Sequence, residues 1–384
     1  MNSASDDIHC PHFGPCSGCQ KDEDVGNILL FQEARDFFLK LGISPFHLHR
    51  KSAVSWRYRA KLAVQGSVLT PHIGLYKRGS HDVLDIPQCK VHHPLINCAI
   101  KIILDWIIQE GISPYEKGGL LRYLQLTVEN TTNQLQVVFV FNIREDMWKG
   151  SQLALEALNK LWDARVDLWH SFWINFNPAE GNVIFSPRWH LVKGKRWLNL
   201  RIEAAKTSIR LHPGSFMQAN VEVFNDLLVR LKSFVPRGTH LLEYYAGAGV
   251  IGLSLLDRCE KICFVEIFPM AKECFEESIK PLTQEEKLRL SFIVANSAKS
   301  ANLLDEKFDL VIVDPPRKGL DQNLLNALCA VKKNLRLIYI SCGFESFKRD
   351  CDTLLQSGWK LAHAESFLFF PGSEHLEVLA IFDS

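Results

Sequence analysis

The second half of the chain alternates short apolar runs with helix-length segments, and this rhythm limits the fold more than any other feature. Five runs have this character: "HLLEYY", "KICFVE", "LSFIVAN", "FDLVIVD" and "LRLIYIS". Strands without a polar side are buried on both faces, as in a parallel sheet that helices cover on each side. The sequence therefore predicts an α/β fold with a doubly wound, mostly parallel sheet.

The chain closes with "SFLFF" and "HLEVLAIFD", which are joined by "PGSE". This pattern predicts an antiparallel hairpin at the sheet edge. Upstream the pattern is mixed, with helical spacing over residues 27–42 and 95–109 and with strands at "RYRAKLAVQG", "LLRYLQLTVEN", "QLQVVFVFN", "FWINFN" and "NVIFS". We expect a strand-rich α+β region over residues 1–205 and the doubly wound domain over residues 206–384.

A glycine-rich turn follows the first of the five apolar strands. In "EYYAGAGVIG" the spacing is G-x-G-x-x-G, at Gly247, Gly249 and Gly252, and Glu266 ends the next strand. A carboxylate at that place can accept both hydroxyls of a ribose. The motif suits a dinucleotide and S-adenosylmethionine equally well.

Polar residues also end the following two strands. Asn296 closes "VAN" and is a candidate contact to an adenine edge, and Asp314 opens "DPPRKG". Carboxyl ends of parallel strands are where open α/β sheets bind ligands. A rigid proline loop without ligand contacts is the alternative for "DPP".

Cys342 follows the fifth apolar strand, and Glu377 lies on the closing hairpin between apolar residues. An inert buried thiol and a solvent-facing strand residue are the simple alternatives. Together, a thiol nucleophile, a carboxylate base and a methyl-donor pocket suit methylation of carbon 5 of uracil. A thiolate that adds to carbon 6 makes carbon 5 nucleophilic, and a base then removes the carbon 5 proton. The site is therefore expected to lower the pKa of the cysteine.

Three cysteines lie close together near the start, in "HCPHFGPCSGCQ". The chain has 11 cysteines and no export signal, which favours a reducing, cytoplasmic setting over disulfides. The C-x5-C-x2-C spacing of Cys10, Cys16 and Cys19 suits iron–sulfur ligation with one distant cysteine, and four thiolates suit zinc equally.

The net charge of +1 indicates no particular partner, but the charges are unevenly placed. Residues 50–78 contain no acid and carry Arg57, Arg59 and Lys61, and residues 188–201 mix basic groups with two tryptophans. Such segments suit phosphates and unstacked bases, although a solvated surface is the alternative. No apolar run approaches the ~20 residues that cross a bilayer, so no membrane partner is expected, and no stable protein partner can be inferred.

The chain resembles the uracil-5 RNA methyltransferases that act on tRNA and ribosomal RNA. The resemblance rests on motifs that follow the family's order along nearly the whole chain: "CPHFGPCSGCQ", "IPQCKVHH", "FMQAN", "EYYAGAG", "VE" at 265–266, "DPPRKG", "ISCGFESFKRD" and "HLE". It implies a Rossmann-like, S-adenosylmethionine-dependent domain and an RNA-binding N-terminal region that carries a [4Fe–4S] cluster on Cys10, Cys16, Cys19 and Cys89.

The resemblance also implies roles for single residues. Cys342 is the expected nucleophile and Glu377 the expected base. The expected S-adenosylmethionine contacts are Gln218, Tyr245, Glu266 and Asp314, with Gly247 in the glycine-rich turn and Asn296 as the candidate adenine contact. Phe216 is expected near the flipped base, and Arg57, Arg59 and Lys61 near RNA phosphates.

The chain departs from the family in three places. Residues 243–247 are Glu-Tyr-Tyr-Ala-Gly where the family has Asp-Leu-Tyr/Phe-Cys-Gly, which keeps an acid and an aromatic ring. Gly343 stands where the family has an asparagine after the nucleophile, a change expected to loosen that loop. No small β-barrel precedes the cysteines, as in shorter members that include 23S rRNA enzymes, so 23S rRNA is the expected substrate.

Three alternatives remain at this stage. In the first, the substrate is a uridine of tRNA and not of ribosomal RNA. The chain can be an RNA-binding or folding factor that kept the fold without the chemistry, as the change at Gly343 suggests. A zinc-stabilised methyltransferase acting on protein or small molecules is the third.

Overall fold

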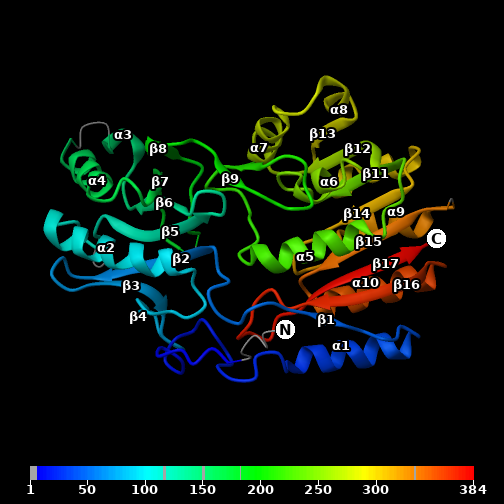
Figure 1. Cartoon of the computed structure of the whole chain (residues 1–384), viewed down its shortest axis with the longest axis horizontal. Coiled ribbons are helices and arrows are strands. Elements are labelled where there is room, and N and C mark those ends of the chain that lie inside the picture. The colour runs from blue at the N-terminus through cyan, green and yellow to red at the C-terminus, as the bar shows by residue number, and fades with distance from the viewer. Residues whose placement is uncertain (1–6, 116–117, 149–151, 182, 333) are drawn as a thin grey trace. The chain divides into compact units, whose positions relative to one another are not determined.

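The computed structural model describes residues 7–115, 118–148, 152–181, 183–332 and 334–384, which form two compact units (Figure 1). The first unit contains Met1–Val25, Ser52–Leu200 and His212–Ala219, and the second contains Gly26–Lys51, Arg201–Leu211 and Asn220–Ser384. The expected single boundary near residue 205 does not capture this arrangement, because residues 26–51 pack with the second unit.

The second unit is built on an eight-stranded sheet in the order β1-β16-β17-β15-β14-β11-β12-β13. Its strands are β1 (Leu48–His49), β11 (Thr239–Tyr244), β12 (Cys259–Glu266), β13 (Leu290–Val294), β14 (Leu310–Val313), β15 (Arg336–Ser341), β16 (Lys360–Phe367) and β17 (Glu377–Asp383), and β10 (Ile209–Leu211) lies outside this sheet. β11 to β15 pair in parallel, whereas β17 is antiparallel to both β15 and β16. The predicted mostly parallel, doubly wound sheet is confirmed.

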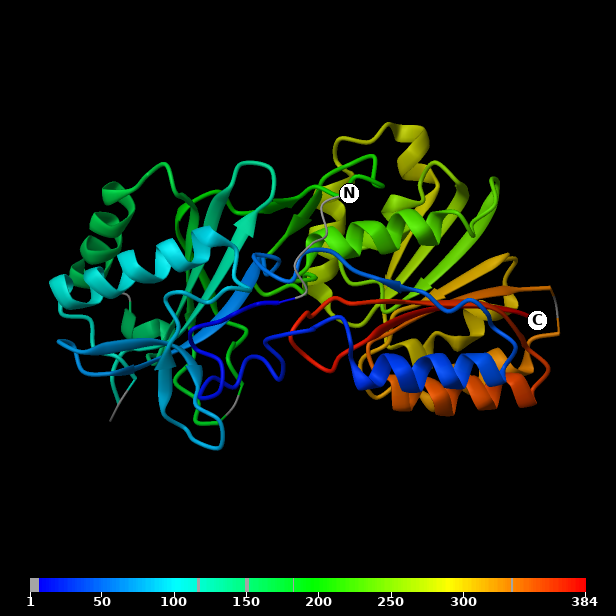
Figure 2. The same cartoon turned by 60° about the horizontal axis from the view of Figure 1, so that its bottom comes forward.

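Helices cover both faces of this sheet. They are α1 (Leu29–Lys40), α5 (Val221–Lys232), α6 (Val250–Ser254), α7 (Pro269–Ile279), α8 (Gln284–Leu288), α9 (Gln322–Ala330) and α10 (Phe344–Gln356), with 3₁₀ turns η1 (Ser297–Lys299) and η2 (Ala301–Asp305). Figure 2 shows α1 and α10 side by side along one face. Phe38 of α1 contacts Phe344 and Phe347 of α10, with ring centroids 6.2 and 5.7 Å apart. Segments more than 300 residues apart in sequence therefore share one core.

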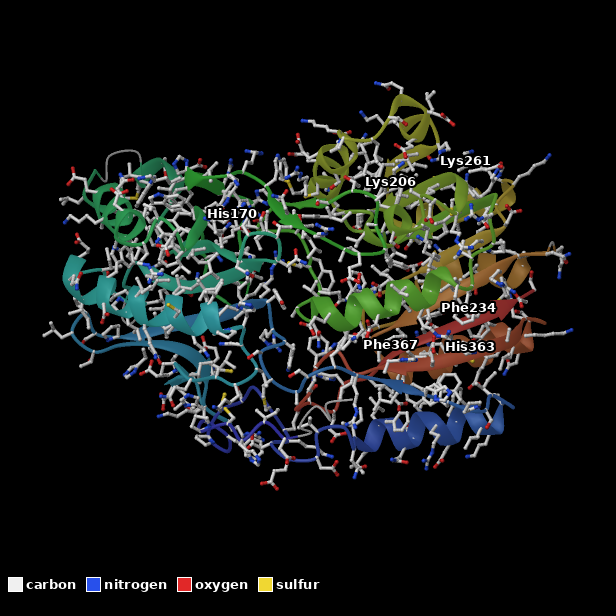
Figure 3. The ribbon with its side chains drawn as sticks, viewed as in Figure 1. His170, Lys206, Phe234, Lys261, His363 and Phe367 are labelled. Carbon is white, nitrogen blue, oxygen red and sulfur yellow. The ribbon has the colours of Figure 1, made fainter. Side chains whose placement is uncertain are left out.

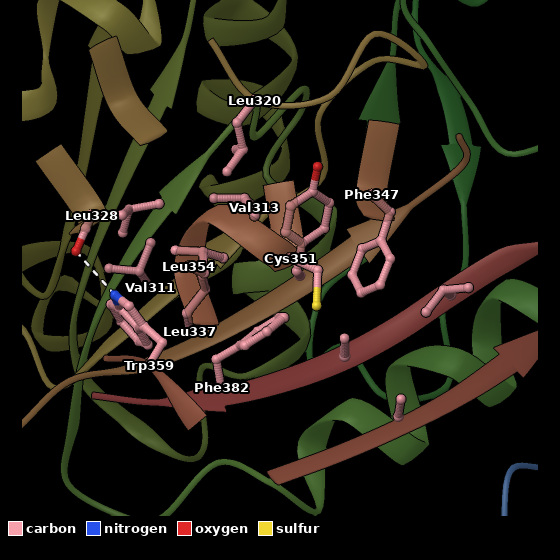
Figure 4. Close-up of a cluster of buried hydrophobic side chains, with 14 of the residues drawn as sticks. Val311, Val313, Leu320, Leu328, Leu337, Phe347, Cys351, Leu354, Trp359 and Phe382 are labelled. Atoms are coloured by element: carbon pink, nitrogen blue, oxygen red, sulfur yellow. Dashed lines mark hydrogen bonds between the residues drawn. The ribbon is translucent and has the colours of Figure 1, made fainter. Parts of the chain in front are cut away.

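That core is apolar and closely packed. The exposed fraction of Leu320, Phe347, Cys351 and Leu354 is 6% or less, and these side chains lie in one cluster with strand residues of β14, β15 and β17 (Figure 4). At its rim the indole of Trp359 donates to Leu328 O at 3.1 Å, the bond dashed in Figure 4. Burial of this kind supplies most of the stability of such a sheet, at about 25 cal/mol per Å² of apolar surface.

The closing hairpin is antiparallel, as predicted, but it does not form the edge of the sheet. β17 lies between β15 and β16, and β1 pairs outside β16 through Leu48↔Ser366 and His49↔Phe367. Phe367, which Figure 3 labels, stacks on the ring of His49 with centroids 4.6 Å apart. The predicted edge position of the hairpin was therefore wrong. β1 takes the edge instead, and its two residues are too few to show a strand pattern in the sequence.

The first unit holds a seven-stranded, mostly antiparallel sheet in the order β4-β3-β2-β5-β6-β7-β8. Its elements are β2 (Arg59–Gly66), β3 (Pro71–Tyr76), β4 (Val83–Asp85), α2 (Pro94–Glu110), β5 (Leu121–Glu129), β6 (Gln134–Phe141), α3 (Glu145–Trp148), α4 (Gln152–Ala164), β7 (Trp169–Phe176), β8 (Trp189–Gly194) and β9 (Leu198–Leu200). β6 and β7 run parallel, because α3 and α4 form the crossover between them. The predicted strand-rich α+β architecture is present.

One predicted strand of this unit is absent. Residues 183–186, within "NVIFS", form no strand. Asn177 Nδ2 donates to the carbonyl oxygens of Val183 and Ile184, and Asn175 Nδ2 donates to Ser186 O. These side chains take the backbone partners that a neighbouring strand would otherwise supply. In the described part of the chain, no helix has the length and apolarity to span a membrane.

Candidate active site

The glycine-rich turn lies at the carboxyl end of β11, as expected. Gly247 N donates to Glu266 Oε2 at 2.9 Å, and Phe268 N donates to Glu266 Oε1 at 3.0 Å. Two backbone donors therefore fix the carboxylate that ends β12, and its remaining lone pairs can accept hydroxyl groups. The glycine-rich turn and Glu266, which the sequence placed in one ligand site, are therefore in contact.

Glu243 lies beneath this turn and is almost completely buried. Its Oε2 accepts a hydrogen bond from Gly252 N at 2.7 Å. Burial raises the pKa of Glu243 well above its usual range, and the nearby acids Asp314 and Glu266 add to that effect. A buried acidic side chain therefore contacts the turn, at the position where the family has an aspartate.

Two other predicted cofactor residues have local structural partners. Asn296 Oδ1 accepts from Ala298 N at 2.8 Å and caps η1, which leaves its amide nitrogen for another acceptor. Tyr245 has a positive φ of 58°, and its hydroxyl oxygen accepts from Asp321 N at 3.2 Å. Their contact with a nucleoside stays a prediction.

Asp314 directly follows β14, and Cys342 directly follows β15, its parallel neighbour. The Cys342 thiol donates to Pro315 O at 3.8 Å, so the expected nucleophile and the "DPP" loop are in contact. Burial raises the pKa of Asp314 to about 7. The two groups that sequence placed at strand ends therefore lie together.

Glu377 is the first residue of β17 and only 5% exposed. The antiparallel register pairs Ser341 with Val378, so the next position sets Cys342 across from Glu377. Burial raises the pKa of Glu377 to about 8; Asp314 acts in the same direction, and Arg317 opposes it. A carboxyl group with this pKa exchanges its proton near neutral pH, which suits a general base.

The pKa of Cys342 is not lowered, contrary to the expectation from sequence. Burial raises it to about 12, with further contributions from the negative charges of Glu377 and Asp314. The guanidinium of Arg317 is the group that opposes them. Strand-end position singled out Cys342 as the expected nucleophile, but its pKa depends on neighbours from two distant segments, the loop with Asp314 and Arg317 and the start of β17.

Arg317 is the site residue to which sequence analysis gave no role. It belongs to the quoted "DPPRKG" motif, three residues after Asp314, and this position was the available signal. Its charge lowers the pKa of both Cys342 and Glu377. The positive charge that acts on both expected catalytic residues therefore belongs to a surface arginine.

Gln218 and Phe216 lie on residues 212–219, which belong to the first unit. The Phe216 side chain is 75% exposed, as a ring that stacks on a base requires, and Gln218 is half-buried. Their roles toward the cofactor and the base stay predictions.

The three basic residues assigned to RNA differ in exposure. Arg59 is buried; its Nε donates to Thr127 Oγ1 at 3.1 Å and its Nη1 to Ser215 O at 2.6 Å. Arg57 stacks over the Trp56 ring at 4.6 Å, and Lys61 is exposed beside the Phe185 ring, 4.8 Å from its centroid. Arg59 is thus a structural residue of the sheet, and its expected phosphate contact is not supported.

The four cysteines assigned to a cluster belong to one unit and influence one another. Burial raises the pKa of Cys19 to about 12, and Cys89, Cys10 and Cys16 each add to that effect. The backbone of Cys16 forms an isolated antiparallel β-bridge with Lys77, between β3 and β4. Asn97 Nδ2 donates to Cys89 O at 2.9 Å. Among the described residues, no three His, Cys, Asp or Glu side chains are gathered as a metal-binding group.

Comparisons with known proteins identify the family of this chain. Residues 190–383 match the family model described as tRNA (uracil-5-)-methyltransferase. An RNA methyltransferase of Protochlamydia amoebophila is 39% identical over 380 residues, which are 98% of this chain and 97% of that protein. One of Geobacter sulfurreducens is 28% identical over 88% of this chain and 66% of its own length.

A solved structure has the same fold. It is a tRNA (uracil-54, C5)-methyltransferase of Pyrococcus abyssi in complex with S-adenosyl-L-homocysteine, with a TM-score of 0.74 and 23% identity. The match covers 92% of this chain and 82% of that one. The mixed α/β sheet of the second unit is therefore of the Rossmann-like methyltransferase type.

Proposed function

The chain belongs to the tRNA (uracil-5-)-methyltransferase family, and from that premise we propose that it methylates carbon 5 of a uridine in RNA. One observation carries the proposal: the register of β15 and β17 sets Glu377 across from Cys342, at the strand ends that also hold Asp314. This reaction needs a thiol nucleophile and a base that act on adjacent carbons of one ring.

The proposed methyl donor is S-adenosylmethionine. Glu266, fixed by two backbone donors, suits the ribose hydroxyls, and Asp314, whose pKa of about 7 leaves it partly ionised near neutral pH, suits a cationic ligand. Tyr245, Gly247 and Asn296 complete the proposed contacts within the second unit. When bound, the donor supplies an electrophilic methyl group on a positively charged sulfur.

Cys342 performs the first step. Its thiolate adds to carbon 6 of the uracil and forms a C–S bond, while the electrons of the carbon 5–carbon 6 double bond become an enolate. Because the thiolate is the reactive form, the opposing charge of Arg317 favours this step. Carbon 5 is then nucleophilic enough to take a methyl group.

Glu377 performs the last step. Its carboxylate accepts the proton from carbon 5, the C–H electrons rebuild the double bond, and the C–S bond breaks to release the Cys342 thiolate. The pKa of about 8 lets the same carboxyl group return that proton to solvent near neutral pH. The uridine must be unpaired or flipped out to reach these groups.

Two RNA substrates fit the proposal: 23S rRNA, which the sequence analysis favours, and tRNA, which the family description names. We expect 5-methyluridine at one position of 23S rRNA in cells that carry the protein, and its loss on deletion of the gene. Mass-spectrometric mapping of both RNAs decides. A site lost from tRNA alone selects the tRNA alternative, and no lost site in either RNA contradicts the function.

We also propose that Cys10, Cys16, Cys19 and Cys89 hold a [4Fe–4S] cluster with a structural role. The support is the donor set itself: Cys89, Cys10 and Cys16 lie close enough to add to the burial that raises the pKa of Cys19, and four thiolates need a positive partner. The cluster takes no part in the methylation steps, which use groups of the second unit.

Protein purified without oxygen is expected to contain about four irons per chain and to absorb broadly in the visible range. Cys19→Ser should lose most of this iron, because three thiolates hold the cluster poorly. Cys98→Ser, a cysteine of α2 outside the set, is the matched control and should keep it. Iron analysis is the measurement, and one zinc per chain without iron would contradict the proposal.

Lys61 remains a candidate phosphate contact. Lys61→Ala is expected to weaken RNA binding a few-fold and to reduce the slope of log affinity against log salt by about one, because one fewer counterion is released. Lys160→Ala is the control, since this exposed lysine of α4 pairs with Glu110 at 2.8 Å. Affinity measured at several salt concentrations decides. Equal slopes for native protein and Lys61→Ala would make Lys61 an ordinary surface lysine.

A further inference from the structure

The loop after β14, residues 314–320, is held against α10 by three side chains. Ser346 Oγ donates to Arg317 O at 2.8 Å, Arg349 Nη2 donates to Lys318 O at 2.9 Å, and Leu320 N donates to Asp350 Oδ2 at 2.8 Å. Residues 346, 349 and 350 share one face of the helix. We call these three side chains the α10 clamp.

The α10 clamp and the loop pack so closely that two glycines at their contact leave no space for a Cβ atom. Gly319 has a φ of +84°, and a Cβ there would lie 2.5 Å from Asp350 Oδ2 and 2.6 Å from Arg349 Nη2. At Gly343 a Cβ would lie 2.5 Å from Arg317 O. The missing side chain at residue 343, which the sequence suggested would loosen the nucleophile loop, instead lets that loop meet the Arg317 backbone.

Asp350 is the fixed point of the clamp. It is fully buried, and its Oδ2 also accepts from the Tyr339 hydroxyl at 2.9 Å. Its Oδ1 accepts from Arg349 Nε at 3.0 Å and Nη2 at 2.8 Å. Leu320, at the end of the loop, lies in the same apolar cluster as Phe347 of α10 (Figure 4). A buried carboxylate with all these hydrogen bonds restricts the loop to one conformation.

The clamped loop carries Arg317, and the position of that charge matters chemically. Besides burial, the charged groups that act on Cys342 are Glu377 and Asp314, which raise its pKa, and Arg317, which lowers it. On Glu377 the charged groups are Asp314 and Arg317. His375 also faces Arg317. Because Coulomb energy falls with distance, a loop that moves away weakens the one favourable charge.

We propose that Ser346, Arg349 and Asp350 are positioning residues that hold Arg317 beside Cys342 and Glu377. The three side chains bond to the loop that carries Arg317, so in this proposal they act through the arginine. The inference rests on the proposed function for its meaning, but the placement of Arg317 relative to the thiol can be measured without any RNA.

The experiment measures how fast iodoacetamide alkylates Cys342 at pH 8, by mass spectrometry of the peptide that contains it, with neither RNA nor methyl donor present. Alkylation follows the thiolate fraction, so Ser346→Ala is expected to slow it about two- to fivefold. Arg317→Ala should slow it at least as much. Lys348→Ala, another cation of α10, is the control, because it pairs with Glu33 and Glu345 and not with the loop.

The decisive comparison is the double variant. If the clamp acts through Arg317, Ser346→Ala should cause no further slowing in the Arg317→Ala protein. Equal slowing in both backgrounds, or none in the native one, overturns the proposal. Arg349→Lys, which keeps the charge but cannot bond both partners, gives a second test if Ser346→Ala folds poorly. A changed thiol rate without any 5-methyluridine would contradict the proposed function alone.

Discussion

Cys342→Ala is expected to make no 5-methyluridine and to form no covalent complex with RNA, a loss of at least about 10³-fold in methylation. The reason is chemical: without the thiolate, carbon 5 of uracil is not nucleophilic. S-adenosylmethionine should still bind, because the proposed donor contacts lie on other residues. Calorimetry measures donor binding, and denaturing gels detect the adduct.

Cys329→Ala is the matched control for this loss. Cys329 is a half-buried cysteine of α9 whose thiol also donates weakly to a carbonyl, Thr353 O at 3.8 Å, as Cys342 does to Pro315 O. Its removal should leave methylation near the native rate. If Cys342→Ala retains measurable methylation, the nucleophile is another group and the mechanism given above is wrong.

Glu377→Gln is expected to fail one step later than Cys342→Ala. The thiol can still add and carbon 5 can still take the methyl group, but the amide cannot accept the carbon 5 proton. A methylated protein–RNA adduct should therefore accumulate and survive denaturing electrophoresis. Adding Cys342→Ala to the same chain should abolish the adduct, and normal turnover by Glu377→Gln would remove Glu377 from the role of base.

The stability of Glu377→Gln shows whether the variant is folded. The pKa of Glu377 rises from an ordinary 4.5 to about 8 in the folded chain. Its contribution to stability is thus complete below pH 4.5 and is lost as pH rises through 8, because folding must then bury a charge. The neutral glutamine avoids this loss. The free energy of unfolding of the variant should therefore exceed that of the native protein by about a few kcal/mol at pH 9 and should equal it at pH 4.

Three site residues that sequence identified, Glu266, Asp314 and Cys342, share one property: they end or directly follow a strand. Asp314 and Cys342 follow "LVIV" and "RLIYIS" directly, and Glu266 closes β12. An apolar run bounded by a polar residue is visible in one dimension, and a parallel sheet brings such ends to one edge. Sheet topology thus turns a local pattern into a prediction of neighbours.

What sequence could not predict depends on contacts between distant segments. The raised pKa of Cys342 comes from burial together with Glu377 and Asp314, which are remote from it in sequence. Arg59 belongs to an acid-free segment and is nevertheless buried against Thr127 and Ser215. Charge pattern alone does not separate a surface arginine from one that the fold uses internally.

The β1–β16 pair has a consequence for synthesis on the ribosome. Leu48 emerges early but pairs with Ser366, close to the end of the chain. At roughly 5–20 residues per second, its partner follows about 15 to 60 seconds later. During that interval Phe38 has neither Phe344 nor Phe347 to cover it. Until that partner is made, the nascent chain therefore exposes the apolar face of α1, which makes α1 a natural binding segment for a chaperone.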